Sequence, residues 1–400
     1  MAESPHALRN TSTLAPAFDK QDEQFSAAFS ILREAVTQRA FPAASTAVTY
    51  KGRLLAVKSF GAFVYPEPGA PLLTDFGSSG RGHVSPATLF DLASLTKPVA
   101  TTTMAMTLYE RGQLELDAPV AAIIPEFMPG RSDLRRGSVT FRHLLAHCSG
   151  LPAYEKLFLR AHSRDELLHE AFSTPLTSDP ASHAEYSDIG FIILGVALER
   201  IAEEAVDAFC QREIFGRLGM SNTAFNPPAA IRQQIPPTAD ERQERCGSDT
   251  AVGQPRTLRN RIIQGEVQDE NAFVLGGVAG HAGLFSTAND IARYAEAMLT
   301  GGPPILLPET ISLFTRRESS PPDTTRTLGW DTPSTLSQSG RHFGPRSYGH
   351  LGYTGTSLWI DPDRKLSVTL LTNRTWPNCS NQAIKQVRPK FHDAIVEALF

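Results

Sequence analysis

Hydrophobic residues near the start of the chain follow two different periods, and each period predicts a different element. Apolar residues three and four positions apart form one stripe, which predicts a helix. The members of this stripe are Phe25, Phe29, Leu32 and Val36. Two runs rich in β-branched and aromatic residues follow, AASTAVTY and RLLAVKSFGAFVY, on either side of Lys51 and Gly52. This arrangement predicts a β-hairpin that turns at these two residues.

The pattern from about residue 94 to 220 is mainly helical. The clearest helical segments are DELLHEAF (165–172) and the long apolar run IGFIILGVALERIAEEAVDAFCQREIF (189–215). Residues 222–270 are rich in proline and polar residues, and their periodicity is weak. The segment STANDIARYAEAML (286–299) then predicts another helix.

Strand patterns return near the end of the chain. SLWID (357–361) and LSVTLLTN (366–373) predict two strands joined by a turn at 362–364, and an amphipathic helix closes the chain. Strands therefore lie at both ends, with helices between them. This order predicts an α+β fold, in which one antiparallel sheet is built from both termini and flanked by helices.

The length of 400 residues favours about two domains, at roughly 150 residues per domain. Residues 1–20 carry no periodic pattern, and we expect a flexible tail there. Residues 21–93 and 275–400 together predict a discontinuous α/β sheet domain. Residues 94–274 predict an inserted, mostly helical domain.

Composition narrows the class of protein and its partners. Hydrophobic residues make up 41% and charged residues 20%, which is typical of a globular protein, and the formal net charge of −4 gives no indication of nucleic-acid binding. No apolar run reaches the roughly 20 residues of a membrane span, and no secretory signal is evident. The four cysteines show no C-x-x-C spacing. We therefore expect a cytoplasmic protein with reduced thiols.

The first candidate for chemistry is Ser94-Leu95-Thr96-Lys97, the only S-x-x-K sequence in the chain. Positions i and i+3 share one face of a helix, so the Ser94 hydroxyl and the Lys97 amine can meet. A serine hydroxyl needs a base to take its proton, and lysine can act as that base if its pKa is lowered. The free N–H groups of a helix N-terminus also stabilise an oxyanion. Alone, the pattern also fits a solvated helix start.

The second candidate is Tyr186-Ser187-Asp188, directly before the apolar helix that begins at residue 189. A tyrosine beside a lysine can relay a proton. Taken by itself, Tyr186 also fits a core tyrosine.

The third candidate is the glycine-rich segment 348–357, YGHLGYTGTS, which includes His350, Gly352 and Tyr353. Glycines let a strand edge approach a ligand closely, and such an edge presents backbone N–H groups to a bound carbonyl. The alternative is an ordinary glycine-rich turn before the last hairpin.

Other chemistries have less support. The chain has no G-x-S-x-G nucleophile elbow and no glycine-rich phosphate loop. His143 and His147 are four residues apart, but the glutamate of H-E-x-x-H is missing, so packing or capping is expected of them. We predict no metal and no cofactor.

The three motifs, in this order, resemble the serine β-lactamase and penicillin-binding-protein superfamily, in particular its class C β-lactamase, esterase and D-alanyl carboxypeptidase branch. Further similar phrases are VTFRHLLAHCSGLP (139–152), EIFGRLGMSNTAF (213–225) and GEVQDENAFVLGGVAGHAGLFSTANDIARY (265–294). The resemblance extends from about residue 25 to 400. It implies a β-lactamase/transpeptidase-like fold with the site between the sheet and the helical part.

The resemblance also implies roles for individual residues. Ser94 would be acylated, Lys97 and Tyr186 would shuttle its proton, and His350 would take the place of the Lys or His of the third motif. The backbone N–H groups of Ser94 and Tyr353 would form the oxyanion hole. Water would then hydrolyse the acyl-enzyme.

Two departures from the family pattern bear on the substrate. The third motif commonly begins with lysine, but here it begins with His350, and the second often ends in asparagine, but here it ends in Asp188. Both changes make the pocket less electropositive, because histidine is mostly neutral at pH 7. We therefore expect an esterase or amidase acting on a small, neutral acyl substrate. Arg346 is the residue that could supply the missing charge.

Three positions complete the predicted substrate site, and alternatives to the predicted function stay open. Gly352 and Asp188 are expected to face the substrate, and His281 lies among glycines in GHAGLFS (280–286), where it lines the pocket or has a structural role. One alternative function is a β-lactamase or D-Ala-D-Ala carboxypeptidase. Another, from a different class, is a non-catalytic ligand-binding or sensor protein that keeps the pocket.

Overall fold

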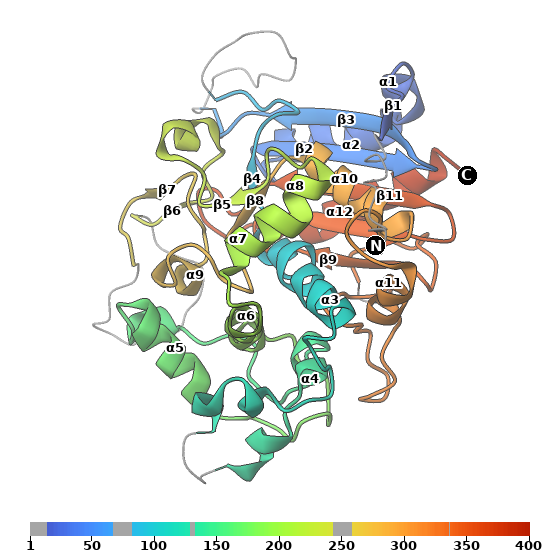
Figure 1. Ribbon diagram of the computed structural model, residues 1–400. Helices are drawn as coiled ribbons and strands as arrows, with labels where there is room; N and C mark the ends of the chain where they lie inside the picture. Colours follow the sequence, from blue (N-terminus) through green and yellow to red (C-terminus); the bar gives the residue numbers. More distant parts are fainter. Residues whose placement is uncertain (1–13, 67–81, 129–132, 243–257, 336) are drawn as a thin grey trace, which may run out of the picture.

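The computed structural model describes residues 14–66, 82–128, 133–242, 258–335 and 337–400 (Figure 1). Residues 1–13 of the predicted flexible tail lie outside these ranges. The described end of that segment differs from the prediction, because β1 (Ala15–Pro16) pairs in parallel with β3. Its backbone therefore extends the main sheet by one short edge strand.

The main sheet has six strands in the order β1-β3-β2-β11-β10-β9. Its longer strands are β2 (Ala43–Tyr50), β3 (Arg53–Gly61), β9 (Tyr348–Leu351), β10 (Ser357–Asp361) and β11 (Leu366–Thr372). β11 pairs antiparallel with β2, so the two ends of the chain meet at the centre of the sheet, as predicted for the α+β fold. The predicted hairpin is confirmed, since Lys51 and Gly52 have φ values of 48° and 78°, as a tight hairpin turn requires.

Helices cover both faces of this sheet (Figure 1). α2 (Ser26–Thr37) and α12 (Ile384–Glu397) pack together on one face, and α10 (Ala288–Leu299) packs on the other. Successive residues of β2 point to opposite faces: Val48 joins the cluster under α2 and α12, whereas Ala47 joins the larger core. Covering on both sides explains why β2 and β11 are buried along nearly their whole length.

The helical part is built around α6 (Asp188–Ala202), whose residues from Ile189 to Leu198 are all buried. The long helical run predicted for 189–215 is interrupted. Glu203 has φ 54°, a left-handed conformation that ends α6, and the chain resumes with α7 (Val206–Cys210) and η7 (Gln211–Phe215). The other α-helices described are α1 (Gln21–Gln24), α3 (Thr103–Glu110), α4 (Phe141–Leu145), α5 (Arg164–Ser173), α8 (Gly216–Leu218), α9 (Glu270–Val274) and α11 (Pro308–Thr315).

A small three-stranded sheet links the two parts of the molecule. Its order is β4-β8-β5, formed by β4 (Phe90–Asp91), β8 (Leu284–Ser286) and β5 (Ala224–Phe225). The weakly periodic segment 222–270 thus contains β5, together with the paired strands β6 (Ala239–Asp240) and β7 (Ile262–Ile263). Because β4 ends at Asp91, this sheet fixes the chain just before Ser94.

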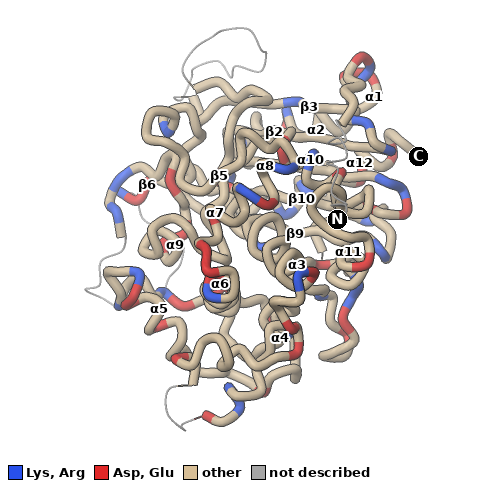
Figure 2. Tube along the Cα trace, viewed as in Figure 1, with Lys and Arg blue, Asp and Glu red and all other residues tan. Residues whose placement is uncertain are grey.

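Basic and acidic residues are interspersed along the described chain, and neither sign dominates in Figure 2. Among the helices of the described residues, none combines the length and the apolar character needed to span a bilayer.

Candidate active site

Ser94 lies at a sharp bend between β4 and the helices that follow it. It is the middle residue of η1 (Ala93–Leu95), which is followed by η2 (Lys97–Thr102) and α3. The residue before it, Ala93, has φ 47°, a conformation that is strained for a residue with a side chain. Asp91 supports this bend, because its Oδ1 accepts a hydrogen bond of 2.8 Å from the Ala93 N–H. The bend presents Ser94 to a pocket.

Asp91 is a buried carboxylate with two backbone donors. Its Oδ1 accepts the hydrogen bond from the Ala93 N–H, and its Oδ2 accepts a hydrogen bond of 2.7 Å from the Gln268 N–H. Burial raises the pKa of Asp91 to about 6, although both backbone hydrogen bonds act in the opposite direction. Asp91 therefore ties the bend at Ser94 to the segment around residue 268.

Lys97 is completely buried beside Ser94 and is held on three sides. Its Nζ lies 3.0 Å from Ser94 Oγ, 3.0 Å from the His281 carbonyl oxygen and 2.6 Å from Asp188 Oδ1. Burial acts to lower the pKa of Lys97, but the Asp188 carboxylate and the Tyr186 phenol outweigh it and raise the pKa above its ordinary value. Lys97 is therefore an ammonium in the resting protein and donates to Ser94, contrary to the lowered pKa that a resting lysine base requires.

Tyr186 and Asp188 are positioned by the start of α6. Ser187 caps this helix, since its Oγ accepts a hydrogen bond of 3.0 Å from the Gly190 N–H. Tyr186 thus lies just before the helix and Asp188 in its first turn. The Lys97 Nζ is 4.8 Å from the centre of the Tyr186 ring. Burial raises the pKa of Tyr186, with the Lys97 cation acting against it, so the phenol keeps its proton at neutral pH.

Two buried imidazoles flank the Tyr186 ring. The His147 and His350 ring centres lie 4.7 and 5.8 Å from it. His350 Nδ1 donates to the Leu351 carbonyl at 2.8 Å, and within the described chain its Nε2 has no hydrogen-bond partner. Burial, followed by the Lys97 charge, lowers the pKa of His350 well below its ordinary value. His350 is therefore a neutral imidazole with an available lone pair on Nε2.

His143 and His147 have the packing and capping roles expected of them. His143 forms a capping box with Thr140 at the start of α4. His147 accepts a hydrogen bond from the Ser187 N–H at 3.0 Å, and its ring stacks on Phe191. In the part of the chain that the structure describes, no group of three His, Cys, Asp or Glu side chains could hold a metal ion.

The turn between β9 and β10 lies against the backbone just before Ser94. Thr354 Oγ1 donates to the Asp91 carbonyl at 2.7 Å, and Thr356 Oγ1 donates to the Leu92 carbonyl at 2.9 Å. A Cβ atom on Gly352 would collide with the Leu92 carbonyl oxygen and with Thr356 Oγ1. Glycine is therefore needed at position 352 for this close approach.

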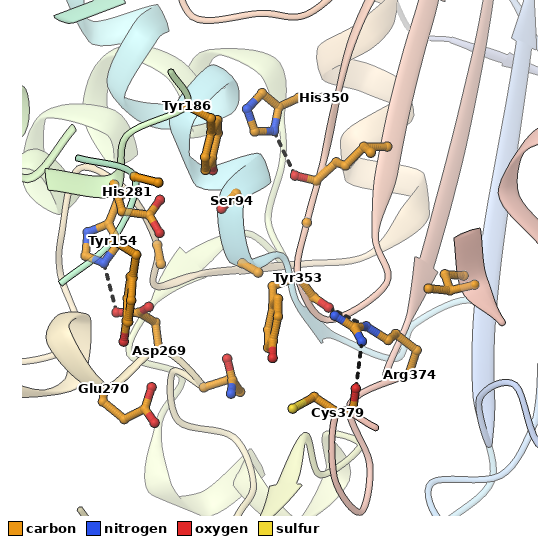
Figure 3. Close-up of a pocket in the computed structure, with 18 of the residues that line it drawn as sticks. Ser94, Tyr154, Tyr186, Asp269, Glu270, His281, His350, Tyr353, Arg374 and Cys379 are labelled. Carbon is orange, nitrogen blue, oxygen red and sulfur yellow. Dashed lines mark hydrogen bonds and ion pairs between the residues drawn. The ribbon is translucent and has the colours of Figure 1, made fainter. Parts of the chain in front are cut away.

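The residues of the three motifs line one pocket with a volume of about 620 Å³ (Figure 3). Nearly all of the predicted site residues are among its lining residues: Ser94, Tyr186, Asp188, His281, His350, Gly352 and Tyr353. Lys97 is buried directly behind Ser94. The lining comes from the main sheet, the helical part and the segment 268–282, so the pocket lies where these parts meet.

Arg346, the residue that could supply charge to the substrate site, lies outside this pocket. Arg346 lies in the turn before β9, and its side chain is 74% exposed. Its guanidinium forms an ion pair with Asp363, in the turn between β10 and β11. It is not among the residues that line the pocket.

Three other arginines line the pocket instead, and sequence reasoning missed all of them. The Arg326 guanidinium carbon lies 5.5 Å from the centre of the Tyr186 ring. Arg374 lies 4.5 Å from the Tyr353 ring, and Arg388 reaches the pocket from α12. None of them belongs to a recognisable motif, and two come from irregular segments, so no sequence signal marked them.

His281 and Asp269 form a second pair of groups in the pocket, and only His281 was predicted from the sequence. His281 Nε2 lies 2.8 Å from Asp269 Oδ1, and both residues line the pocket (Figure 3). Burial acts to raise the pKa of Asp269, but His281 outweighs it and holds the pKa below its ordinary value. Asp269 and Glu270 are adjacent acidic residues in GEVQDENAF (265–273), and this pair is the signal in the sequence that could have identified Asp269.

An α+β fold with a serine, a lysine and a tyrosine gathered at one pocket defines a serine hydrolase. The chain belongs to the beta-lactamase family, whose family model matches residues 28–388, and this confirms the resemblance expected from the three motifs.

Among the proteins that are similar to it are two curated relatives and two solved structures. The "N-acetylmuramyl-L-alanine amidase" of Bacillus subtilis is 32% identical over 84% of this chain and 77% of the relative. The "Putative D-alanyl-D-alanine carboxypeptidase" of Escherichia coli is 34% identical over 72% of this chain and 69% of the relative. The structure of "EstCE1, a hydrolase with promiscuous acyltransferase activity" matches with a TM-score of 0.72 at 21% identity, covering 94% of this chain and 99% of the other. A penicillin-binding protein homolog from Caulobacter crescentus matches with a TM-score of 0.69 at 17% identity, covering 94% and 98%.

Proposed function

We propose that this protein hydrolyses ester or amide bonds of small acyl substrates through an acyl-enzyme on Ser94. The observation that carries the proposal is the contact between Lys97 Nζ and Ser94 Oγ at 3.0 Å, inside a pocket that also contains Tyr186. Burying an ammonium is costly even with a counter-ion such as Asp188, and buried charged groups of this kind cluster at functional sites. A non-catalytic binding protein has no need of this arrangement.

The resting charges suggest how the proton of Ser94 is moved. Lys97 is protonated, so it accepts the Ser94 proton only after passing one of its own to Asp188, which lies 2.6 Å away. The Ser94 oxygen then attacks the substrate carbonyl carbon, forming a C–O bond while the carbonyl oxygen becomes an oxyanion. Tyr186 gives its phenol proton to the leaving group as the old bond breaks. Lys97 then reprotonates Tyr186, and Asp188 returns its proton to Lys97, so that the resting charges are restored.

The remaining groups serve the oxyanion and the water. The N–H groups of Ser94 and Tyr353 are proposed as oxyanion donors, which is the electrostatic contribution that acyl transfer depends on most. The His350 Nε2 lone pair, beside Tyr186, is proposed to accept a hydrogen bond from the water that attacks the acyl-enzyme. As the water oxygen bonds to the acyl carbon, one proton of that water passes by way of Tyr186 and Lys97 to Ser94 Oγ while the bond between Ser94 and the acyl group breaks. This releases the acid and restores Ser94.

Neutral substrates are the first choice for the acyl group. His350 carries no charge, and Asp188 offsets the charge of Lys97, so the groups closest to Ser94 provide no net positive charge. Small neutral esters and amides avoid the cost of burying a carboxylate in such a place.

A carboxylated substrate, such as a D-alanyl peptide or a β-lactam, is the second candidate, and one observation favours it. Arg326 lines the pocket beside Tyr186 and can bind a carboxylate. The curated relatives described above carry names for amide and peptide hydrolysis.

The cellular location is proposed as cytoplasmic. Cys148 and Cys210 are both buried as free thiols, and burial raises the pKa of each, as expected of unreactive reduced cysteines.

A panel of substrates tests these proposals. The panel compares kcat/KM for an uncharged p-nitrophenyl ester, a carboxylated cephalosporin and a D-alanyl dipeptide, with mass detection of acylated Ser94. A higher value for the ester supports the neutral class, and a higher value for the cephalosporin or peptide supports the second candidate. Fluorophosphonate labelling that is absent in Ser94→Ala identifies a catalyst; a wild-type protein that neither labels nor turns over any substrate is a binder instead.

A further inference from the structure

Every backbone carbonyl from Gly352 to Thr356 accepts a hydrogen bond, and two arginines supply most of the donors. Arg388 Nη2 donates to the carbonyls of Gly352 and Thr356, each at 2.8 Å, and its Nε donates to Gly355 at 3.3 Å. Arg374 donates to the other two carbonyls, from its Nε to Tyr353 at 2.7 Å and from its backbone N–H to Thr354 at 2.9 Å.

Arg388 is an unusual residue to find beneath such a turn. It lies on α12 and is 4% exposed, and its Nη1 donates to Gln338 at 2.8 Å. Burial, together with the Arg374 charge, lowers the pKa of Arg388 to about 9, so it is a cation at neutral pH. Burying a guanidinium costs several kcal/mol, and apolar packing would fill the same space at lower cost. Filling space therefore does not account for its presence.

The geometry points to a role for Arg388 in catalysis, which rests on the proposed function: we propose that Arg388 is the positioning residue of the oxyanion hole. A trans peptide is planar, and its C=O and N–H point in opposite directions. Arg388 holds the Gly352 carbonyl, so the N–H of the next residue, Tyr353, must point away from the guanidinium. Rotation of this peptide would move the Tyr353 N–H out of line with Ser94.

The charge of Arg388 also strengthens the donor. A cation bound to a carbonyl draws electron density from the peptide and makes its N–H a better hydrogen-bond donor. Thr354 and Thr356 hold the same turn against the chain before Ser94, so both oxyanion donors are fixed relative to each other. A donor fixed in this way needs no reorganisation when the oxyanion forms.

The test compares Arg388→Met, Arg388→Lys and a control on the same helix, Lys390→Met, which removes an exposed cation. Two quantities are measured: kcat and KM for the best substrate of the panel, and the affinity for an aryl boronic acid, which forms a tetrahedral oxyanion mimic on serine. Arg388→Met is expected to lower kcat about 100-fold, in the range seen when one oxyanion donor is lost, and to weaken boronate binding in parallel. KM is expected to change less than about threefold, and Arg388→Lys to recover part of the loss, because it keeps the charge but holds fewer carbonyls.

Thermal unfolding of each variant separates this role from a structural one. If Arg388→Met does not fold, Arg388→Lys decides the question. A folded variant that keeps kcat and boronate affinity within threefold of wild type overturns the inference. So does a variant in which only KM rises, because Arg388 then contacts substrate. If Ser94 of the wild-type protein is never acylated, the proposed function fails and the inference fails with it; if acylation is normal in the Arg388 variants, the inference fails alone.

Discussion

Lys97 and Asp188 form an ion pair beside Ser94, with Nζ and Oδ1 2.6 Å apart and the lysine side chain fully buried. From the sequence, Asp188 was a departure that lowered the positive charge of the pocket. In the structure it is the counter-ion of Lys97, and it is what keeps the lysine protonated. The proton relay proposed above depends on this pair.

Asp188→Asn should change the pH dependence of activity. Without the carboxylate, burial dominates and the pKa of Lys97 falls, while the acceptor for its proton is lost. We expect kcat/KM at pH 7 to fall at least about 10-fold, since general acid–base groups contribute about 10²–10⁴-fold, and to recover as the pH rises and the amine loses its proton. A pH–rate profile measures this, with Asp165→Asn, an exposed carboxylate, as the control. Unchanged activity at pH 7 would rule out the relay.

The same substitution should destabilise the protein in a pH-dependent way. The raised pKa of Lys97 means that the pair stabilises the folded state below the ordinary lysine pKa of 10.5, and this contribution is lost as the pH rises through the folded-state value. Removing Asp188 leaves a buried charge without its partner, which costs about 3–5 kcal/mol. Urea unfolding at pH 7 and pH 9 is expected to show that the variant's loss of unfolding free energy relative to wild type is smaller at pH 9. The reason is that the unpaired Lys97 amine, with its lowered pKa, loses its proton in the folded variant as the pH rises. A deficit that does not depend on pH contradicts this account.

Asp91 should make the stability of the protein depend on mildly acidic pH. Its pKa rises from 3.8 in the unfolded chain to about 6, so the folded protein binds the proton more tightly. This group therefore adds stability as the pH falls from 7 to 4, by up to about 3 kcal/mol for a shift of this size. Asp91→Asn removes the contribution, and the difference in unfolding free energy between variant and wild type should change over that interval. A difference that stays constant from pH 4 to pH 7 would place the pKa of Asp91 near its ordinary value.

The parts predicted correctly from the sequence are those that depend on local pattern. The hairpin at Lys51 and Gly52 follows from turn chemistry, and the central pairing of β2 with β11 follows from strands at both ends of the chain. The break at Glu203 was missed, because the apolar run continues across it and nothing local marks a left-handed residue. The parallel pairing of β1 was missed because a two-residue strand has no period.

The site shows the same division. Ser94, Lys97 and Tyr186 lie in short motifs, so their residue types and spacing were informative. Arg326 and Arg388 lie in no motif, and only the tertiary fold brings them to the pocket. Arg346 lies outside the pocket although it is close to His350 in sequence, because its side chain pairs with Asp363 in the turn between β10 and β11.

Gly352→Ala should disrupt the turn between β9 and β10, which carries the proposed oxyanion donor, the Tyr353 N–H. The added methyl group would collide with the Leu92 carbonyl and with Thr356 Oγ1, and the backbone carbonyl has little freedom to move. We expect the turn to shift away from Ser94 and kcat to fall about 100-fold, as for loss of one oxyanion donor. Gly137→Ala is the matched control, since its methyl group would meet only Met128, at 3.7 Å. Crystallography or boronate affinity of the variant checks the shift; normal boronate binding would contradict it.

Arg326→Gln should reveal which class of substrate the pocket selects. The Arg326 guanidinium lies beside Tyr186, and its only described carboxylate partner in an ion pair is Asp331, at the long distance of 3.9 Å. A substrate carboxylate bound there would form charge-assisted hydrogen bonds worth about 1.5–3 kcal/mol, so their loss should lower kcat/KM for a carboxylated substrate about 10- to 100-fold. An uncharged ester should be affected less than about threefold, because it makes no such contact. Arg346→Gln, whose side chain lies outside the pocket, should change neither rate. An equal loss for both substrates would mean that Arg326 acts through Tyr186 rather than on the substrate, and the argument for a carboxylated substrate would then lose its structural basis.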